Sequence, residues 1–191
     1  MVIPTNELQK INPSAIIELF ELQLFTSIHG QDTLFRFHSG SNQNSNGEII
    51  WEGNTYQRFP IEAEGFEFTG KGQIPRPQLT ISNVLSTITT LIASVNATTA
   101  ANDLNGAKLT RIRTTADNID AANFASGSNP FGTPSSNKFP DEIFFLDRKI
   151  VENRQIVQYE LVSEIDQANV RIPKRQITRK DFSGVGTFID A

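Results

Sequence analysis

The sequence contains no cysteine among its 191 residues. This absence excludes a disulfide framework, a thiolate-held zinc site, an iron–sulfur cluster and a cysteine nucleophile within these residues. Long hydrophobic runs are also missing, since no stretch approaches the roughly 20 apolar residues that span a bilayer. The N-terminal region is too polar for a signal peptide, because Glu18, Glu21 and Gln23 interrupt its apolar run. We therefore expect a soluble protein made in the cytoplasm.

Basic charge is scarce as well, with 17 Lys and Arg against 21 Asp and Glu, a net charge of −4. Binding to nucleic acid phosphates requires a net basic face, so we do not expect nucleic acid as the main partner. The charged fraction of 20% suits a folded chain better than a disordered one. The length suits one domain, or two small domains that share an interface.

The sequence gives only weak signals for groups of residues that could form a catalytic site. His29 and His38 have no carboxylate at a fixed spacing, so we interpret them as exposed or hydrogen-bonded residues rather than metal ligands. Acids on facing strands would fit a glycosidase, but acids on the wet face of a sheet are the simpler interpretation. The acids considered are Glu62, Glu64, Glu67, Glu142 and Glu164. We therefore expect no catalytic residue, no metal site and no enzymatic activity.

Short apolar and alternating segments separated by turn residues predict a mainly β (α+β) fold, with an antiparallel barrel-like or sandwich-like arrangement. Gly65 interrupts the alternation of its segment and is expected to form a β-bulge. The expected strands lie within 15–26 and at 34–38, 49–51, 55–59, 63–68, 78–81, 107–114, 142–149 and 155–162.

One short helix is expected near residues 84–98. Its apolar residues recur at helical spacing, and Asn83 is a suitable capping residue. The expected buried face consists of Val84, Leu85, Ile88, Leu91, Ile92 and Val95.

Two segments lack such patterns. Residues 118–140 are rich in Ser, Gly, Asn and Pro, which predicts a long mobile loop. Phe124, Phe131 and Phe139 lie within it, and we expect docking onto a neighbouring molecule to order the loop. The expected organisation is a β-rich region at 1–165, either undivided or split into subdomains near 1–115 and 116–165, followed by an extended basic C-terminal arm at 166–191.

The arm concentrates positive charge. Residues 166–181 carry a net +3, which leaves −7 on the remainder because the whole chain carries −4. Three interpretations of the arm remain open: it contacts nucleic acid, it docks onto an acidic neighbour such as a second copy, or it is a solvated tail. The cations are Arg171, Lys174, Arg175, Arg179 and Lys180. With Phe124 and Phe131 they are the candidate interface residues.

Residues 51–83 carry a distinctive series of turn and anchor residues, WEGNTYQRFPIEAEGFEFTGKGQIPRPQLTISN. This series resembles the signature of the phage minor tail protein L family. The matching residues are Trp51, Gly53, Tyr56, Pro60, Ile61, Gly65, Phe66, Glu67, Gly70, Lys71, Gly72, Arg76, Pro77, Leu79, Thr80, Ser82 and Asn83. Gly, Pro and Trp at such positions define a β scaffold rather than chemistry.

The resemblance implies a structural part of the distal tail tip, or baseplate hub, of a long-tailed bacteriophage. It implies a homotrimeric ring whose partners are the central hub or fibre protein and the proteins on the tail-tube side. Lambda-type relatives continue into a cysteine-bearing region resembling an iron–sulfur module; this sequence has no cysteine, so we expect that cofactor to be absent. The alternatives are a receptor- or glycan-binding β module of the virion and a carboxylate-based cell-wall hydrolase.

Overall fold

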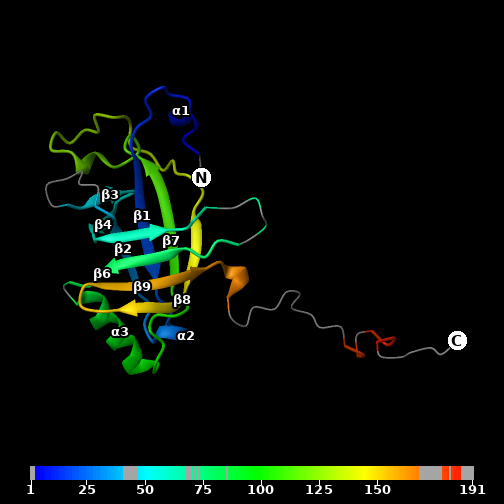
Figure 1. The fold of residues 1–191 in the computed structure, drawn as a ribbon. Helices are drawn as coiled ribbons and strands as arrows, with labels where there is room; N and C mark the ends of the chain where they lie inside the picture. The colour runs from blue at the N-terminus through cyan, green and yellow to red at the C-terminus, as the bar shows by residue number, and fades with distance from the viewer. Residues whose placement is uncertain are drawn as a thin grey trace.

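A computed structural model describes residues 3–40, 47–67, 70, 72, 74–84, 86–167, 178–180 and 182–185. Within these residues, nine strands form one sheet in the order β3-β4-β2-β1-β7-β8-β9-β6-β5 (Figure 1). The strands are β1 (Ile16–Gln23), β2 (Leu34–His38), β3 (Ile49–Trp51), β4 (Asn54–Arg58), β5 (Ile61–Glu64), β6 (Gln78–Ser82), β7 (Lys108–Thr115), β8 (Glu142–Glu152) and β9 (Ile156–Val162). The helices are α1 (Thr5–Leu8), α2 (Thr26–His29) and α3 (Thr87–Thr98), with 3₁₀ turns at Ala121–Asn123 and Glu164–Asp166.

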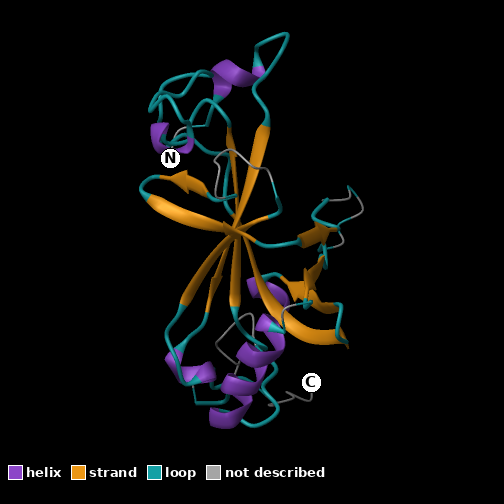
Figure 2. Ribbon diagram, turned by 90° about the vertical axis from the view of Figure 1, so that its left-hand side faces the viewer, coloured by secondary structure: helices purple, strands orange, loops and turns teal. Residues whose placement is uncertain are grey.

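The mainly β prediction is confirmed, whereas the barrel is wrong. The strand order runs from β3 to β5, and among the described residues these two end strands do not pair with each other. All neighbouring strands are antiparallel except β2 and β4, which pair in parallel. Figure 2 shows the strands fanning out around the centre of the molecule, which is the strong twist expected of an open sheet.

The antiparallel pair β1–β7 is the centre of the sheet and is buried on both faces. Leu19 lies opposite Ile112, and both side chains enter a second core with Trp51. Phe20 and its neighbours on the other face enter the main core. The main core comprises Phe20, Leu22, Leu24, Phe37, Ile61, Leu79, Ile81, Ile88, Ile92, Val95, Leu104, Ala107, Leu109, Phe144, Leu146, Val157, Tyr159 and Leu161. The second core comprises Ile17, Leu19, Ile49, Trp51, Tyr56, Ile112, Ala116 and Ile119.

The predicted helix is confirmed as α3, but it begins later than the sequence indicates. Val84 precedes it and is 71% exposed, because the left-handed backbone of Ser86 (φ 54°) separates this turn from the helix. The buried face of α3 consists of Ile88, Ile92 and Val95, which pack into the main core. Among the described residues, none of the helices has the length and hydropathy that crossing a bilayer requires.

The prediction of a strand at 63–68 with a bulge is wrong. The strand β5 begins at Ile61 and ends at Glu64, because Gly65 adopts a left-handed backbone (φ 83°) that leaves the sheet. Phe66 then turns back and packs edge-on against Phe144, with 5.3 Å between ring centroids. The apparent strand therefore combines a short edge strand with a turn that returns an aromatic ring to the main core.

Residues 118–140, which were predicted to form a long mobile loop, make hydrogen bonds and ring contacts to the chain's own body. Asn129 donates hydrogen bonds from Nδ2 to the carbonyl oxygens of Ala116 and Ile119, both at 3.0 Å. Phe124 packs against the second core and contacts Phe131, with 5.9 Å between ring centroids. Asparagine side chains thus supply bonds that a regular element would supply with its backbone.

This loop also covers one end of the sheet. The carbonyl of Ile50 in β3 accepts from Asp120 N (3.2 Å) and from Asn123 Nδ2 (2.6 Å), while Ile50 N donates to Asn123 Oδ1 (2.7 Å). Asn123 therefore imitates a neighbouring strand with its side-chain amide. The open hydrogen-bonding edge of β3 is closed in this way.

Substitution Asn123→Ala tests this closure. The partly buried backbone groups of Ile50 lose their side-chain partner, so we expect the free energy of unfolding to fall by about 1–3 kcal/mol. Urea unfolding followed by circular dichroism measures the loss. Asn137→Ala is the matched control, because the Asn137 side chain makes no hydrogen bond to a described residue. An equal loss in both variants would contradict the closure.

Candidate functional site

The first part of the signature, Trp51, Gly53 and Tyr56, builds the second core. Trp51 is 2% exposed and donates from Nε1 to the carbonyl of Ser135 at 3.3 Å. The Tyr56 hydroxyl donates to Glu21 Oε1 at 2.9 Å, and its pKa is raised by burial and by the Glu21 carboxylate. Gly53 (φ 72°) forms the tight turn between β3 and β4. These residues fix the strands at one end of the sheet.

The second part, from Pro60 onward, joins β5, β6 and β9. Pro60 accepts from the backbone N–H of Ser82 at 2.9 Å, and the buried Pro77 accepts from that of Leu161 at 2.8 Å. A side chain at Gly65 would lie 3.4 Å from Pro77 Cα, in a conformation that glycine favours. Both prolines therefore sit where the chain needs a carbonyl acceptor and no N–H donor.

Phe66 lies beside a cluster of charged side chains on the β1–β7–β8 surface. The Arg111 guanidinium lies 4.4 Å from the centroid of the Phe66 ring and forms ion pairs with Glu18 and Glu142. Arg113 also pairs with Glu142, at 2.7 Å. Two cations and two acids balance here, so this surface is paired rather than poised for acid–base chemistry.

Arg76 is a clamp that bridges two carboxylates. Its guanidinium lies 3.2 Å from Glu160 and 2.7 Å from Asp166, which belongs to the 3₁₀ turn after β9. Arg148 contacts the other oxygen of Glu160 at 2.5 Å. Burial alone would raise the pKa of Glu160, but hydrogen bonds from the two guanidinium groups outweigh it and lower the pKa. Arg76 thereby ties the turn at 164–166 to the sheet.

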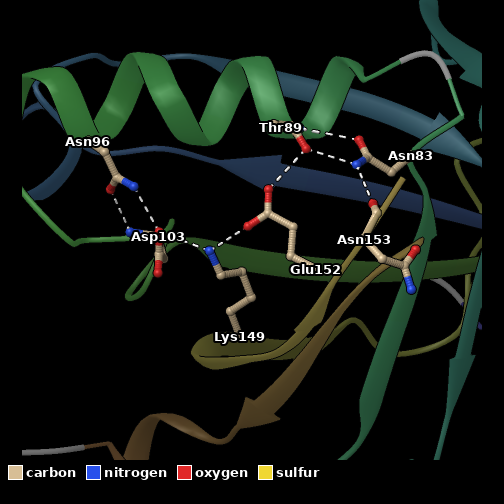
Figure 3. Close-up of polar contacts among 7 residues, drawn as sticks. All are labelled: Asn83, Thr89, Asn96, Asp103, Lys149, Glu152 and Asn153. Atoms are coloured by element: carbon tan, nitrogen blue, oxygen red, sulfur yellow. Dashed lines mark hydrogen bonds and ion pairs between the residues drawn. The ribbon is translucent and has the colours of Figure 1, made fainter. Parts of the chain in front are cut away.

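Asn83 connects the start of α3 to the β8–β9 hairpin (Figure 3). Its Nδ2 donates to Thr89 Oγ1 and to the carbonyl of Asn153, both at 2.8 Å, and its Oδ1 accepts from Thr89 N at 3.3 Å. Asn83 was predicted to be the N-cap residue, but Ser86 occupies that position, without a side-chain bond. Asn83 instead bonds the first turn from three residues further back, through Thr89 N.

The network continues along α3. Thr89 donates to Glu152 at 3.0 Å, and Lys149 bridges Glu152 (2.6 Å) and Asp103 (3.1 Å). Asp103 accepts from the Asn96 side chain at 2.8 Å near the end of the helix. Figure 3 shows these side chains in a row between the helix and the hairpin. Each end of α3 is therefore fixed by charged or amide groups in addition to its apolar face.

The remaining predicted residues lie at the surface or outside the described residues. Gly70 and Gly72 have open space around them. Phe131 is 55% exposed, while Phe124 is half-buried beneath it. Arg179 and Lys180 are exposed, and the other candidate interface cations lie outside the described residues. These are Arg171, Lys174 and Arg175.

Both histidines are buried and hydrogen-bonded. His29 accepts from Phe25 N at 3.0 Å and lies 3.2 Å from the carbonyl of Asn105, while His38 bonds the carbonyl of Gly47 at 2.9 Å. Burial lowers the pKa of His38. Within the described residues, no group of three or more His, Asp or Glu side chains could hold a metal.

A hollow of about 370 Å³ lies between β2, β4 and α3. Its walls are mainly apolar and include Phe35, Phe59 and Leu91. None of the signature residues lines it. The signature is therefore placed in the framework of the sheet rather than around this hollow.

Sequence reasoning missed the residues that close and join the sheet. Asp120, Asn123 and Asn129 act through side-chain bonds to distant backbone groups. The only local signal was the density of Asn and Asp in a segment without periodicity. Glu160 could have been noted as an acid on a mainly apolar strand.

Comparison with known proteins gives one family. The sequence profile of the family described as phage minor tail protein L matches residues 26–184. The chain is 34% identical over 125 residues to the tail tip protein L of Escherichia phage lambda. That alignment covers 65% of this chain and 49% of the relative, so the chain spans about half the relative's length.

Substitution Asn83→Ala tests the helix connection. We expect a loss of about 1–3 kcal/mol in the free energy of unfolding, because the carbonyl of Asn153 and the backbone N–H of Thr89 lose their partner in the buried Asn83 side chain. Ser86→Ala is the matched control and should change stability by less than about 0.5 kcal/mol. Chemical denaturation of both variants gives the comparison, and a larger loss at Ser86 would refute the role of Asn83.

Substitution Arg76→Gln tests the clamp through its pH dependence. The pKa of Glu160 lies below its ordinary 4.5, so its ion pairs stabilise the fold above that pH and cease to do so as pH falls through the lowered pKa. In the variant the pKa should rise, and less stability should be lost on acidification. NMR titration of Glu160 measures the pKa. Arg154→Gln, at an exposed hairpin residue, should leave it unchanged.

Proposed function

The chain belongs to the phage minor tail protein L family, and from this premise we propose that it is a structural component of the distal tail tip in the virion of a long-tailed bacteriophage. In this proposal it forms a ring, as a homotrimer, that joins the end of the tail tube to the central hub or fibre protein. Its work is mechanical: it holds partners in place and catalyses no reaction.

The observation that carries the proposal is the position of the family signature. Trp51 and Tyr56 fix one end of the sheet, while Arg76 and Asn83 tie β9 and α3 to the other half. A signature devoted to the framework is what a family selected for shape would keep. An enzyme signature would instead converge on one concave surface.

The charge distribution supports assembly with other copies of the same chain or with acidic proteins. Residues 166–181 carry a net +3 on an otherwise acidic chain, and opposite charges on two surfaces favour a defined orientation on encounter. Identical subunits joined through two different surfaces close into a ring when the rotation allows it.

We further propose that these residues hold no iron–sulfur cluster. Such clusters are bound by cysteine thiolates, and the sequence offers none. The rigidity of the chain is then supplied by its own ion pairs and amide networks.

Cryo-electron microscopy of the phage particle tests the proposal. We expect the nine-stranded sheet in three copies around the tail axis, between the last ring of the tube and the central fibre. An outermost, solvent-facing position would favour a receptor-binding module instead. Peptidoglycan cleavage by the purified chain that is lost on a single Glu→Gln change would contradict the structural role.

A further inference from the structure

The two ends of the sheet differ in how their backbone edges are covered. The edge of β3 is closed by Asp120 and Asn123. The edge strand at the other end, β5, pairs with β6 on one side only, from Ile61 opposite Ile81 to Glu64 opposite Gln78. Among the described residues, no backbone hydrogen bond reaches β5 from its outer side. Its outer donors and acceptors can therefore accept another strand.

The open edge is acidic. Glu62 and Glu64 are exposed on the outer face of β5, and Glu67 is exposed just after it. None of the three forms an ion pair with a described residue, whereas Glu160, two strands away, is held by two arginines. Like charges directly opposite one another destabilise a strand pair, so the acids disfavour pairing between the β5 edges of two copies.

The same chain supplies the complementary charge. Five cations lie between residues 171 and 180, with no acid among them. The described members, Arg179 and Lys180, are exposed. Figure 1 shows residues 178–180 and 182–185, in red, well apart from the sheet of their own chain. The segment begins just after the turn at 164–166, which the Arg76 clamp ties to the sheet.

We propose that the acidic outer edge of β5 is the docking site for the basic segment 171–180 of a second copy of this chain. In this contact the cations of the segment face Glu62, Glu64 and Glu67 at the open edge. Each copy offers one edge and one segment, so the contact is head-to-tail and can close a ring. This inference rests on the proposed ring and names the contact that joins its subunits.

Charge reversal with rescue provides the first test. The substitutions Glu62→Lys, Glu64→Lys and Glu67→Lys together should raise the Kd of self-association at least about tenfold. The substitutions Arg171→Glu, Lys174→Glu and Arg175→Glu should do the same. Mixing the two variants should restore association between them, as measured by sedimentation velocity. Glu52→Lys is a control that should leave the Kd unchanged, because Glu52 is an exposed acid beside β3 at the opposite end of the sheet.

Cross-linking provides the second test, and the absence of native cysteine makes it clean. A chain with Glu64→Cys is mixed with a chain with Arg175→Cys under mild oxidation, and a disulfide-linked heterodimer is expected on a non-reducing gel. The same mixture with Glu52→Cys in place of Glu64→Cys should give none.

Two outcomes overturn the inference. A third sample is a single chain that carries both Glu64→Cys and Arg175→Cys. If a disulfide forms only within that chain and not between two chains, the segment covers the β5 edge of its own chain. A ring present in the particle without any link at β5, and insensitive to charge reversal, would refute this contact while leaving the proposed function intact. If no ring is found in the particle at all, the proposed function fails first.

Discussion

The pairing of β1 with β7 is the constraint on which the rest of the structure depends. Eight residue pairs, from Ile16 opposite Thr115 to Gln23 opposite Lys108, hold the two strands in register. Leu19 faces the second core and Phe20 faces the main core. Because side chains alternate between faces, a slip of one residue would move both sets of apolar side chains to the wrong face. Burial on both faces therefore specifies the register strongly.

The residues of the family signature act in two parts of the structure, the second core and the junctions of β6 with its neighbours. Trp51 and Tyr56 complete the second core, and the Tyr56 hydroxyl reaches back to Glu21 on β1. Pro77, Arg76 and Asn83 act at the junctions of β6 with β9 and α3, where polar backbone and side-chain groups would otherwise be left unpaired. Unpaired polar groups cost more than paired ones contribute. The signature residues at these junctions therefore lie where the loss of a polar partner would destabilise the fold most.

The sequence predicted some strands more accurately than others. The strand signals at 34–38, 107–114 and 155–162 were accurate, because each of these strands places apolar side chains in a core. Alternation failed at Gly65, since the following Phe66 belongs to the same apolar pattern but reaches the core from a turn. In β8, two register shifts leave Ile150 exposed although its spacing matches that of Phe144 and Leu146.

The sequence by itself determined the class of fold, the positions of most strands, the apolar face of the helix and the family. These follow from local periodicity and from side-chain types at fixed spacing, which operate over a few residues. Only the tertiary structure decided that the sheet stays open, that Asn123 closes β3 and that Arg76 joins Glu160 to Asp166. The groups in the last two contacts lie tens of residues apart in the sequence, and no local pattern encodes which edge of the sheet is covered.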